Sequence, residues 1–513
     1  MRLTSLLVLA SMLLSCSDAK KKEESEDASV SAPQVKEEVP ASGLTGKELS
    51  EAYCSSCHAY VNPKELPKAI WIEDVLPEMG NRLGIYKSGS RPDNLFDAGV
   101  SGAIVRKANI YPESPLLAEE DWNKIVQYFR DHAPDSIPPP LRKHKLRTDL
   151  RLFKYKEAPR SGRPAFTTMV KALPGNRGIA YGHSLGNRNT LTFLNPTLQE
   201  NYSLSLQSAP VQFYEKSNEL YLTTIGRKIF PSDAPDGALH RLERNWPEPK
   251  YKPGTVILPD LQRPVCMAFG DLNNDGHEDI AICEFGNNTG WLSWYENNGA
   301  GGYTKRVLRD KPGAVTAIIR DANNDGLPDI YVLMAQGEEG IFLYENQGSG
   351  KFQEKPLLSF SPLNGSQYME LADFNNDGHD DILYVCGDNA DKSPILKKYH
   401  GIYIFLNDAG AGFKQRYFYP MNGAYKAMAR DYDRDGDLDI AAISFFPDYI
   451  RYPEESFVYL RNTGNLKFED YSFPESSKGR WMVMDAGDID GDDDIDLVLG
   501  SFVYFLPDGD TTG

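Results

Sequence analysis

Five acidic windows of nine residues recur along the second half of the chain. They begin at residues 271, 321, 373, 431 and 488, and they read DLNNDGHED, DANNDGLPD, DFNNDGHDD, DYDRDGDLD and DIDGDDDID. The starting points lie 50, 52, 58 and 57 residues apart. A near-constant period of this length is typical of folds built from repeated supersecondary units, because each unit buries its apolar face against the next one. The windows therefore predict a repeat protein.

An apolar run rich in β-forming residues continues from the last aspartate of each window, as in DIAICEF from residue 279 and DLVLGSF from residue 496. Strand-like pieces and glycine-containing turns come next. One unit therefore reads as a strand, an acidic loop and further strands, which is the pattern of one blade of a β-propeller. Two more units, without acidic loops, fit between residues 160 and 260. They contain the strand pairs Gly178–Tyr181 with Thr190–Phe193, and Glu219–Leu222 with Leu239–Leu242.

The number of blades is predicted from length. The 354 residues from 160 to 513 divide into seven units of about 51 residues, which is close to the observed repeat. We therefore expect a mainly β fold, with a seven-bladed β-propeller over residues 148–513 preceded by a small all-α domain. Few residues remain after Asp496, so we expect Asp149–Tyr155 to supply the outer strand that closes the last blade.

The acidic windows have the pattern of a hard-cation site. In the first four windows, positions 1, 3, 5 and 9 carry carboxylate or amide oxygens and position 6 is glycine; in the fifth, glycine moves to position 4 but the ligand spacing is kept. Alternate oxygens that point inward around a sharp backbone turn suit Ca²⁺. The residues expected to bind calcium are Asp271, Asn273, Asp275, Asp279, Asp321, Asn323, Asp325, Asp329, Asp373, Asn375, Asp377, Asp381, Asp431, Asp433, Asp435, Asp439, Asp488, Asp490, Asp492 and Asp496.

These windows are not EF-hands, which need flanking helices and a glutamate at position 12. Position 12 is Ile282, Val332, Tyr384, Ala442 or Leu499, each within a predicted strand. The windows instead resemble the calcium loops of FG-GAP (VCBS-type) repeat proteins, which include the heads of integrin α-subunits. The resemblance implies about five bound Ca²⁺ ions that stabilise the blades rather than take part in catalysis.

The charge of the chain is concentrated in the same windows. They hold 21 Asp, one Glu and one Arg, a net charge of −21, whereas the whole chain has a formal charge of −18. The remainder is therefore nearly neutral. Neither part has the basic face that a general nucleic-acid binder needs to displace counterions, so we expect no nucleic-acid partner.

The N-terminus has the features of an export signal. MRLTSLLVLASMLLSC contains one Arg and an apolar run too short to span a bilayer as a helix. Leu-Leu-Ser-Cys at residues 13–16 resembles the lipobox of bacterial lipoproteins, which implies a signal peptide over 1–15, lipidation of Cys16 and a periplasmic or cell-surface protein anchored to a membrane; the alternative is an ordinary secretory signal. Residues 16–43 lack aromatic residues and periodicity, so we expect a flexible tether.

A Cys-x-x-Cys-His sequence comes after the tether, at Cys54, Cys57 and His58. This is the attachment motif of c-type haem, in which two thiols bond the porphyrin and the imidazole binds the iron. A zinc ribbon would need a second cysteine pair, and the remaining cysteines of the mature chain are solitary. Residues 44–140 resemble a small class I cytochrome c, with a helix leading into the motif and a closing helix at about 118–131. We expect one covalent haem.

The sixth ligand of the haem iron is approached by elimination. Met79 is the only methionine within residues 44–140, and His132 is the only other histidine. We favour Met79, and His132 or an open coordination position are the alternatives. Thioether ligation would raise the reduction potential relative to two histidines.

Two further groups of residues bear on the propeller. Cys266 and Cys283 flank the first acidic window, and symmetry about Asp275 would pair residue 266 with residue 284. That register places the cysteines on opposite faces, so we expect buried thiols and no disulfide. The second group, His183, Arg188, Arg227 and His240, contains the candidates for a polar site in the two blades without acidic loops.

Three functions are compatible with this organisation. The first is electron transfer by an exported, membrane-tethered monohaem cytochrome, with a propeller that binds a partner or ligand; its electrons would come from a redox partner protein or a small-molecule donor. The second is a propeller dehydrogenase that passes electrons to its own haem. The third is an adhesion module that binds glycans or proteins. Electron transfer is favoured because it rests on the motif that carries redox chemistry.

Overall fold

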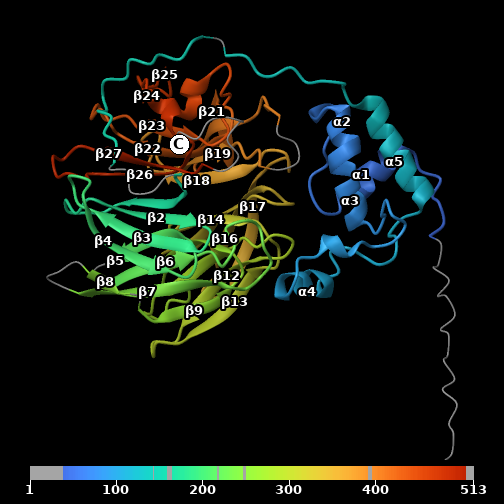
Figure 1. Cartoon of the computed structure of the whole chain (residues 1–513), viewed down its shortest axis with the longest axis horizontal. Coiled ribbons are helices and arrows are strands. Elements are labelled where there is room, and N and C mark those ends of the chain that lie inside the picture. The colour runs from blue at the N-terminus through green and yellow to red at the C-terminus, as the bar shows by residue number, and fades with distance from the viewer. Residues whose placement is uncertain are drawn as a thin grey trace, which may run out of the picture. The chain divides into compact units, whose positions relative to one another are not determined.

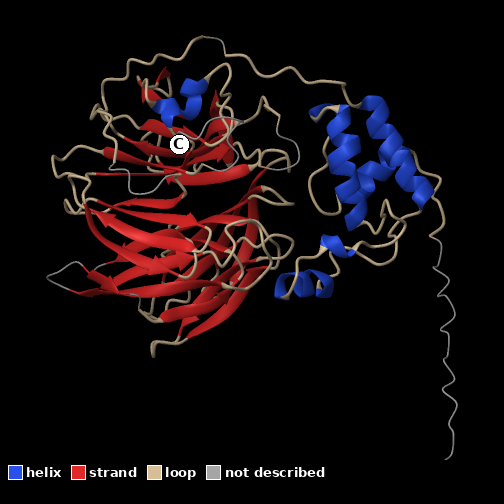
Figure 2. Ribbon diagram, in the orientation of Figure 1, coloured by secondary structure: helices blue, strands red, loops and turns tan. Residues whose placement is uncertain are grey.

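The structure is a computed structural model of the chain, and it describes residues 39–142, 144–158, 164–216, 219–245, 250–252, 254–390 and 395–503. The expected signal peptide, Cys16 and most of the expected tether lie outside these residues. Helices predominate between residues 46 and 132, and strands predominate from residue 167 onward (Figure 2).

Between residues 39 and 142, the structure describes five α-helices and three other helical turns. They are α1 (Gly46–Cys54), η1 (Pro63–Glu65), α2 (Lys68–Ile70), η2 (Trp71–Val75), α3 (Leu76–Arg82), η3 (Asp93–Leu95), α4 (Val100–Lys107) and α5 (Glu119–His132). Helix α1 begins at a capping box, in which Thr45 and Glu48 satisfy each other's backbone amides. The expected helices before the haem motif and at the end of this part are therefore present.

Helices α1 and α5 enclose a small apolar core. Leu49, Ile125 and Phe129 are almost completely buried, and the ring of Phe129 lies 4.5 Å from that of Trp71. The two helices approach most closely at Gly46, where an added Cβ would lie 2.2 Å from the backbone oxygen of Lys124. Glycine at this position therefore permits the close crossing of α1 and α5.

The strands form six blades of four or five strands each, in chain order around a β-propeller (Figure 1). The first two contain β1 (Thr167–Ala172), β2 (Ile179–Leu185), β3 (Arg188–Leu194) and β4 (Glu200–Leu206), then β5 (Pro210–Lys216), β6 (Glu219–Thr224), β7 (Gly237–Asn245), β8 (Lys250–Lys252) and β9 (Val256–Leu261). The next two contain β10 (Pro264–Gly270), β11 (Asp279–Glu284), β12 (Trp291–Asn297) and β13 (Tyr303–Arg309), then β14 (Ala314–Arg320), β15 (Asp329–Met334), β16 (Gly340–Asn346) and β17 (Phe352–Ser359). The last two contain β18 (Ser366–Ala372), β19 (Asp381–Cys386), β20 (Gly401–Asn407) and β21 (Phe413–Pro420), then β22 (Ala424–Arg430), β23 (Asp439–Ser444), β24 (Phe457–Asn462) and β25 (Phe468–Tyr471). A short helical turn, η4 (Pro453–Ser456), precedes β24, and another, η5 (Ser476–Lys478), follows β25.

The prediction of seven blades is wrong. Among the described residues after the sixth blade, which end at residue 503, β26 (Trp481–Gly487) and β27 (Asp496–Ser501) form a ladder of two strands. Residues 149–155 do not complete it: none of them is in a strand, and the neighbouring Arg147 bridges to Tyr471 at the end of β25. The prediction divided the length of the region by the repeat length and so assumed that the last repeat forms a full blade, whereas its described residues form a two-stranded hairpin.

The β26–β27 ladder nevertheless connects the last blade to the first. Lys171 of β1 forms an ion pair of 2.9 Å with Asp485 of β26, and the backbone of Phe166 bridges to that of Phe502. On the other side, Met484 packs with Tyr459 of β24 in one buried cluster. The two ends of the propeller chain are therefore held together by strand pairing and by a partly buried salt bridge.

The apolar runs after the acidic windows form the second strands of the blades. All six residues of β11, β15, β19 and β23 are buried. Such strands are covered on both faces by neighbouring blades, which explains why their sequences are continuously apolar instead of alternating. The strand pairs expected in the first two blades are confirmed, as β2 with β3 and β6 with β7.

The predicted register of the cysteine pair is wrong by one residue. Gly270 pairs with Asp279, so the turn is centred between Asn274 and Asp275, and Cys266 lies directly opposite Cys283. A shift of one residue moves a side chain to the other face of a sheet, and here it brings both cysteines to the same face. Both are nevertheless free thiols in the structure, Cys283 fully buried and Cys266 partly so.

Candidate functional site

Each acidic window lies at the same place in the fold, as the loop between the first and second strands of its sheet. The five loops connect β10 to β11, β14 to β15, β18 to β19, β22 to β23, and β26 to β27. This confirms the predicted order of strand, acidic loop and strand.

The backbone conformation of the loops explains the glycine at position 6. In the first loop, Asn274 has φ of 60° and Gly276 has φ of 86°, and the next three loops repeat both left-handed residues at positions 4 and 6. The fifth loop keeps this conformation with the glycine exchanged, because Gly491 has φ of 86° and Asp493 has φ of 66°. Two left-handed residues in one loop turn the chain sharply, so that alternate side chains face its interior.

Hydrogen bonds within the first loop position its oxygen atoms. The backbone N–H of Gly276 donates to Asp271 Oδ2 at 2.8 Å, and that of Asp275 donates to Asp271 Oδ1 at 3.1 Å. The N–H of His277 donates to Asp275 Oδ1 at 2.8 Å. The second and third loops repeat these bonds with nearly the same distances. The loop geometry is therefore fixed by the protein itself, with side-chain oxygens gathered at positions 1, 3 and 5.

The aspartate at position 9 joins the loop to the blade. Asp279 is fully buried, and its two oxygens accept N–H bonds from Leu272 at 2.9 Å and from Asn297 at 2.7 Å. Burial, with the nearby charges of Asp275 and Asp271, raises the pKa of Asp279 to about 6. The equivalent residues Asp329, Asp381 and Asp439 are also fully buried, and burial raises their pKa values as well. Position 9 therefore organises the loop in addition to any contact with a metal ion.

The hydrogen-bond partners of position 9 were not predicted from the sequence. Asn297, Asn346, Asn407 and Asn462 each donate a backbone N–H to it, and each side-chain amide donates to the carbonyl at position 8. These asparagines end the third strand of each blade, in the recurring pieces YEN, YEN, FLN and LRN. The recurrence of these asparagines in the sequence is the signal that could have identified them as partners of position 9.

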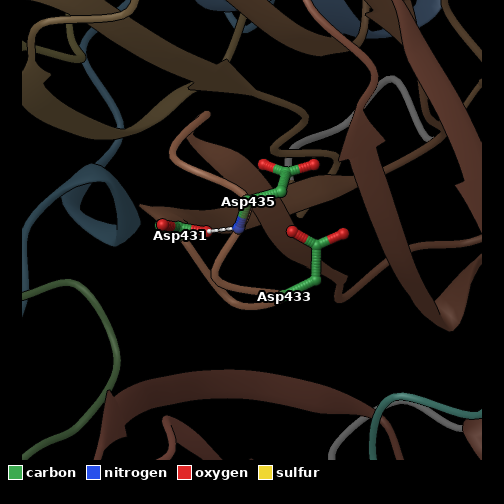
Figure 3. Close-up of side chains that lie close together, drawn as sticks. All are labelled: Asp431, Asp433 and Asp435. Carbon is green, nitrogen blue, oxygen red and sulfur yellow. Dashed lines mark hydrogen bonds between the residues drawn. The ribbon is translucent and has the colours of Figure 1, made fainter.

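The fourth loop gathers three carboxylates most clearly (Figure 3). Asp431, Asp433 and Asp435 each offer an oxygen atom within 4.8 Å of the others, enough to surround one cation. Asp433 Oδ2 forms an ion pair with Arg461 Nε at 2.7 Å, but Asp433 Oδ1 is buried and has no hydrogen-bond partner. A buried carboxylate oxygen without a partner is costly, and a bound cation would satisfy it. The donor set of carboxylate oxygens fits Ca²⁺.

The fifth loop brings a partly different set of carboxylates together. Asp488, Asp490 and Asp496 offer oxygen atoms within 4.8 Å of one another, and Asp492 is not in this group. Asp492 Oδ1 instead accepts the backbone N–H of Asp494 at 3.1 Å. The predicted ligands at positions 1, 3 and 9 are therefore brought together.

The raised pKa values give a test of metal binding by pH. Because Asp279 and Asp439 have pKa values of about 6, they take up protons as the pH falls from 7.5 to 5. A proton on a ligand opposes Ca²⁺, whereas in the calcium-free protein protonation removes the cost of burying the charge. We therefore expect the rise in melting temperature produced by Ca²⁺ to be at least about twofold smaller at pH 5 than at pH 7.5. An equal rise at both pH values, measured by differential scanning calorimetry, would contradict this.

The Cys-x-x-Cys-His sequence lies at the end of α1. The N–H of Cys57 donates to the carbonyl of Cys54 at 3.5 Å, so the chain leaves the helix in a turn between the two cysteines. Cys54 is partly buried and Cys57 is exposed. Burial, with a smaller effect of Cys57, raises the pKa of the Cys54 thiol to about 11. His58 Nδ1 lies 2.8 Å from the carbonyl oxygen of Ala59, which fits an Nδ1–H donor and leaves Nε2 available as a metal ligand.

The candidates for the sixth haem ligand remain separate alternatives. Met79 lies in α3 and packs, partly buried, against the apolar core of the helices. His132 is the last residue of α5, where its Nδ1 lies 2.8 Å from the carbonyl oxygen of Tyr128.

The four candidates for a polar site are not brought together. His183 lies in β2, Arg188 begins β3, and His240 lies in β7 with Nε2 3.0 Å from Thr224 Oγ1. The side chain of Arg227 is 87% exposed and lies 3.8 Å from Asp236. Among the residues described, no hydrogen bond or ion pair joins any two of the four.

The fold and the acidic loops define a class of protein: a β-propeller that contains FG-GAP-like repeats. The FG-GAP-like repeat family matches residues 271–332 and 321–384. The chain is also 32% identical over 142 residues to integrin alpha-4 of Xenopus laevis, an alignment that covers 25% of this chain and 14% of the integrin. The chain thus spans about one seventh of the length of this relative. The FG-GAP resemblance predicted from the sequence is confirmed.

Solved structures give weaker similarities. A protein from Bacteroides uniformis described as a putative 6-phosphogluconolactonase has a TM-score of 0.38 and 12% identity, covering 59% of this chain and 83% of that one. Sqt1 of Saccharomyces cerevisiae has a TM-score of 0.41 and 8% identity, covering 66% of this chain and 93% of Sqt1. Neither similarity is close enough to inform function.

Within the part of the chain that the structure describes, no helix is both long and apolar enough to span a membrane.

Proposed function

We propose that this protein is an exported electron-transfer protein, in which a monohaem c-type cytochrome domain is joined to a calcium-stabilised FG-GAP propeller that binds a partner or ligand. The observation that carries the proposal is the Cys54–His58 motif at the end of a helix, with an imidazole oriented for metal ligation.

The haem assignment rests on the chemistry of this motif. Cys54 and Cys57 would form the two thioether bonds, and His58 Nε2 would bind the iron from one side. The bound haem would supply an iron centre that accepts and releases single electrons. The hydrogen bond between His58 Nδ1 and the Ala59 carbonyl would fix the imidazole tautomer and keep Nε2 free of a proton. The core around Leu49 and Phe129 would hold α1, and with it the start of the motif, in place.

Calcium binding is supported by the loops. Three features favour it: carboxylate oxygens gathered within 4.8 Å in the fourth and fifth loops, the buried Asp433 oxygen without a partner, and a backbone conformation repeated in all five loops. Because all the ligand oxygens are supplied by one loop at the edge of a blade, the bound ions would serve stability and not catalysis. A propeller of this kind then offers a rigid surface for a protein or ligand.

A redox titration tests the proposed function. Protein matured in a host that attaches c-type haem should show one reversible one-electron wave and the visible bands of a low-spin c-type haem. If Met79 is the sixth ligand, Met79→Ala should lower the reduction potential and His132→Ala should leave it unchanged. Absence of a haem absorbance band in the folded, exported protein would contradict the proposal.

The proposed lipid anchor has a separate test, since Cys16 lies outside the described residues. The wild-type protein should partition into the detergent phase with membranes, and Cys16→Ala should move it to the soluble fraction because the acyl chains are lost. Acyl-dependent partitioning of the Cys16→Ala protein would contradict a lipoprotein anchor.

A further inference from the structure

Two cysteine thiols face each other at the base of the first acidic loop. Cys266 of β10 lies directly opposite Cys283 of β11 in the antiparallel ladder. Residues directly opposite in such a ladder have Cα atoms about 4.5–5.5 Å apart and side chains on the same face. A disulfide bond spans Cα distances of about 4.4–6.8 Å. The register therefore places the two sulfur atoms where they can be joined without a change of strand pairing.

This pair of thiols is not a requirement of the repeat. The residue equivalent to Cys266 in each blade is the first one after the shift of register in the first strand. In the three blades that follow, the equivalent pairs contain no cysteine: they are Thr316 with Leu333, Tyr368 with Val385, and Lys426 with Ile443. A blade therefore forms without a thiol at either position, and the facing cysteines are a feature of the β10–β11 ladder alone among these four.

The two thiols differ in their access to solvent. Cys283 is fully buried in the apolar core that also contains Ala281 and Leu292. Cys266 is only partly buried, and it packs against the same core from β10. A reagent that enters from solvent therefore reaches Cys266 before it reaches Cys283.

The surroundings of Cys266 stabilise its thiolate form. The backbone N–H of Ala317, on the first strand of the next blade, donates to Cys266 Sγ at 3.5 Å. The thiol of Cys283 also donates to it, and this contact lowers the pKa of Cys266 against the opposing effect of burial; Lys426 and the side chain of Gln212 act in the same direction. Because the thiolate is the form that attacks a disulfide, Cys266 is placed as the nucleophile of the pair.

The nearby charges favour the same division of roles. Burial and the contact with Cys266 raise the pKa of the Cys283 thiol, and the charge of Glu284 adds to this effect. Glu284 itself forms an ion pair of 2.6 Å with Lys305. The carboxylates that act on Lys426 are also paired, as Asp485 with Lys171 and Glu370 with Arg430. Cys266 is therefore the thiol that ionises first.

A third cysteine of the propeller provides the contrast. Cys386 is fully buried and lies opposite Ser366, and its thiol donates to the carbonyl of Tyr399 at 3.4 Å. Burial raises its pKa to about 12. A buried thiol of this kind is inert toward disulfides, so Cys386 is a reference for an unreactive cysteine in the same fold.

We propose that Cys266 and Cys283 form a reversible dithiol–disulfide pair, which joins β10 to β11 and encloses the first acidic loop in a covalent ring. The Cys266 thiolate attacks one sulfur atom of an external disulfide and releases one thiol; Cys283 then attacks the sulfur of Cys266 and releases the second. Two electrons and two protons pass to the external disulfide, which becomes two thiols. The ring contains the whole window from residue 271 to residue 279.

Controlled oxidation of the calcium-loaded full chain tests this pair. The protein is reduced with dithiothreitol, freed of reductant and incubated with oxidised glutathione as the external disulfide. Remaining thiols are then blocked with N-ethylmaleimide under denaturing conditions, and cleavage before aspartates separates the two cysteines, because Asp271, Asp275 and Asp279 lie between them. By mass spectrometry, we expect a peptide pair linked through Cys266 and Cys283 in more than about half of the chains, reversed by dithiothreitol. Cys386 should stay reduced in the same sample.

Three variants assign the roles of the thiols. Cys283→Ser should stop at a mixed disulfide between glutathione and Cys266, because no second thiol completes the exchange. Cys266→Ser should leave Cys283 unmodified, because that thiol is buried. Cys386→Ala is the matched control and should form the link as the wild type does. Circular dichroism establishes that each variant is folded, and the wild-type result does not depend on any of them.

Two results would overturn the proposal. One is a linked peptide that is absent from the folded protein, or that forms no faster than Cys386 reacts. The other is glutathione retained on Cys266 of the wild type without the link, since Cys283 would then fail to complete the exchange. None of these readouts involves the haem, so their failure would not bear on the proposed electron-transfer function.

Discussion

Removal of divalent cations should lower the melting temperature of the propeller by more than about 10 °C. A ligand at a hundredfold excess over its dissociation constant stabilises the folded state by about 2.7 kcal/mol per site. Two occupied loops would therefore contribute about 5 kcal/mol, and about 1 kcal/mol moves the melting temperature of a domain of moderate size by about 2–4 °C. Without the ion, three carboxylates within 4.8 Å repel each other and a buried oxygen of Asp433 is unpaired.

The measurement is calorimetry with EDTA and after addition of Ca²⁺ or Mg²⁺. Calcium should restore the melting temperature, and Mg²⁺ should restore it less because it requires a smaller octahedral site. Asp433→Asn should reduce the calcium-dependent rise in melting temperature by about the contribution of one site. Glu200→Gln, an exposed change in β4 of a blade without an acidic loop, should have almost no effect on that rise. An unchanged melting temperature in EDTA would show that the loops are not occupied.

Replacement of both Cys54 and Cys57 by alanine should abolish covalent haem completely. Each thiol is needed for one thioether bond, so the double variant retains no covalent link and the single variants retain at most one. The expected result is loss of the haem signal from the denatured protein on a gel, together with loss of the reversible redox wave. Denaturation is essential to the measurement, because a haem held only by His58 would dissociate.

The control for this experiment uses two other cysteines of the same chain. Cys266→Ala and Cys283→Ala should keep the full haem signal, because these thiols lie on β10 and β11 of the propeller. Haem that remains covalently attached to the double variant, or that is lost with the propeller cysteines instead, would contradict the assignment of the motif.

Local features of the fold could be read from the sequence, and long-range closure could not. The acidic loops were located correctly because each is a motif of nine consecutive residues, and the apolar strands after them are buried on both faces. The number of blades was wrong because the outer strands of a last blade must come from distant segments. Residues 149–155 pass beside β25 instead, and β26 and β27 are the strands that the structure describes after the sixth blade.

In the candidate sites, too, local features could be predicted from the sequence and long-range contacts could not. In four of the five windows the left-handed positions 4 and 6 hold asparagine, aspartate or glycine, whereas the fourth window has Arg434 at position 4. The backbone donors of Asn297 and Asn462, however, come from a later hairpin that meets the loop only in three dimensions. The register of Cys266 and Cys283 was predicted wrongly because the turn was assumed to be centred on Asp275, and its centre lies half a residue earlier.

The most direct test of the central claim is the calcium content of the purified protein. The protein would be equilibrated with Ca²⁺, separated from free ion by gel filtration and analysed for metal and protein in the same sample. We predict about five calcium ions per chain, one for each acidic loop. Less than about one calcium ion per folded chain would contradict the account.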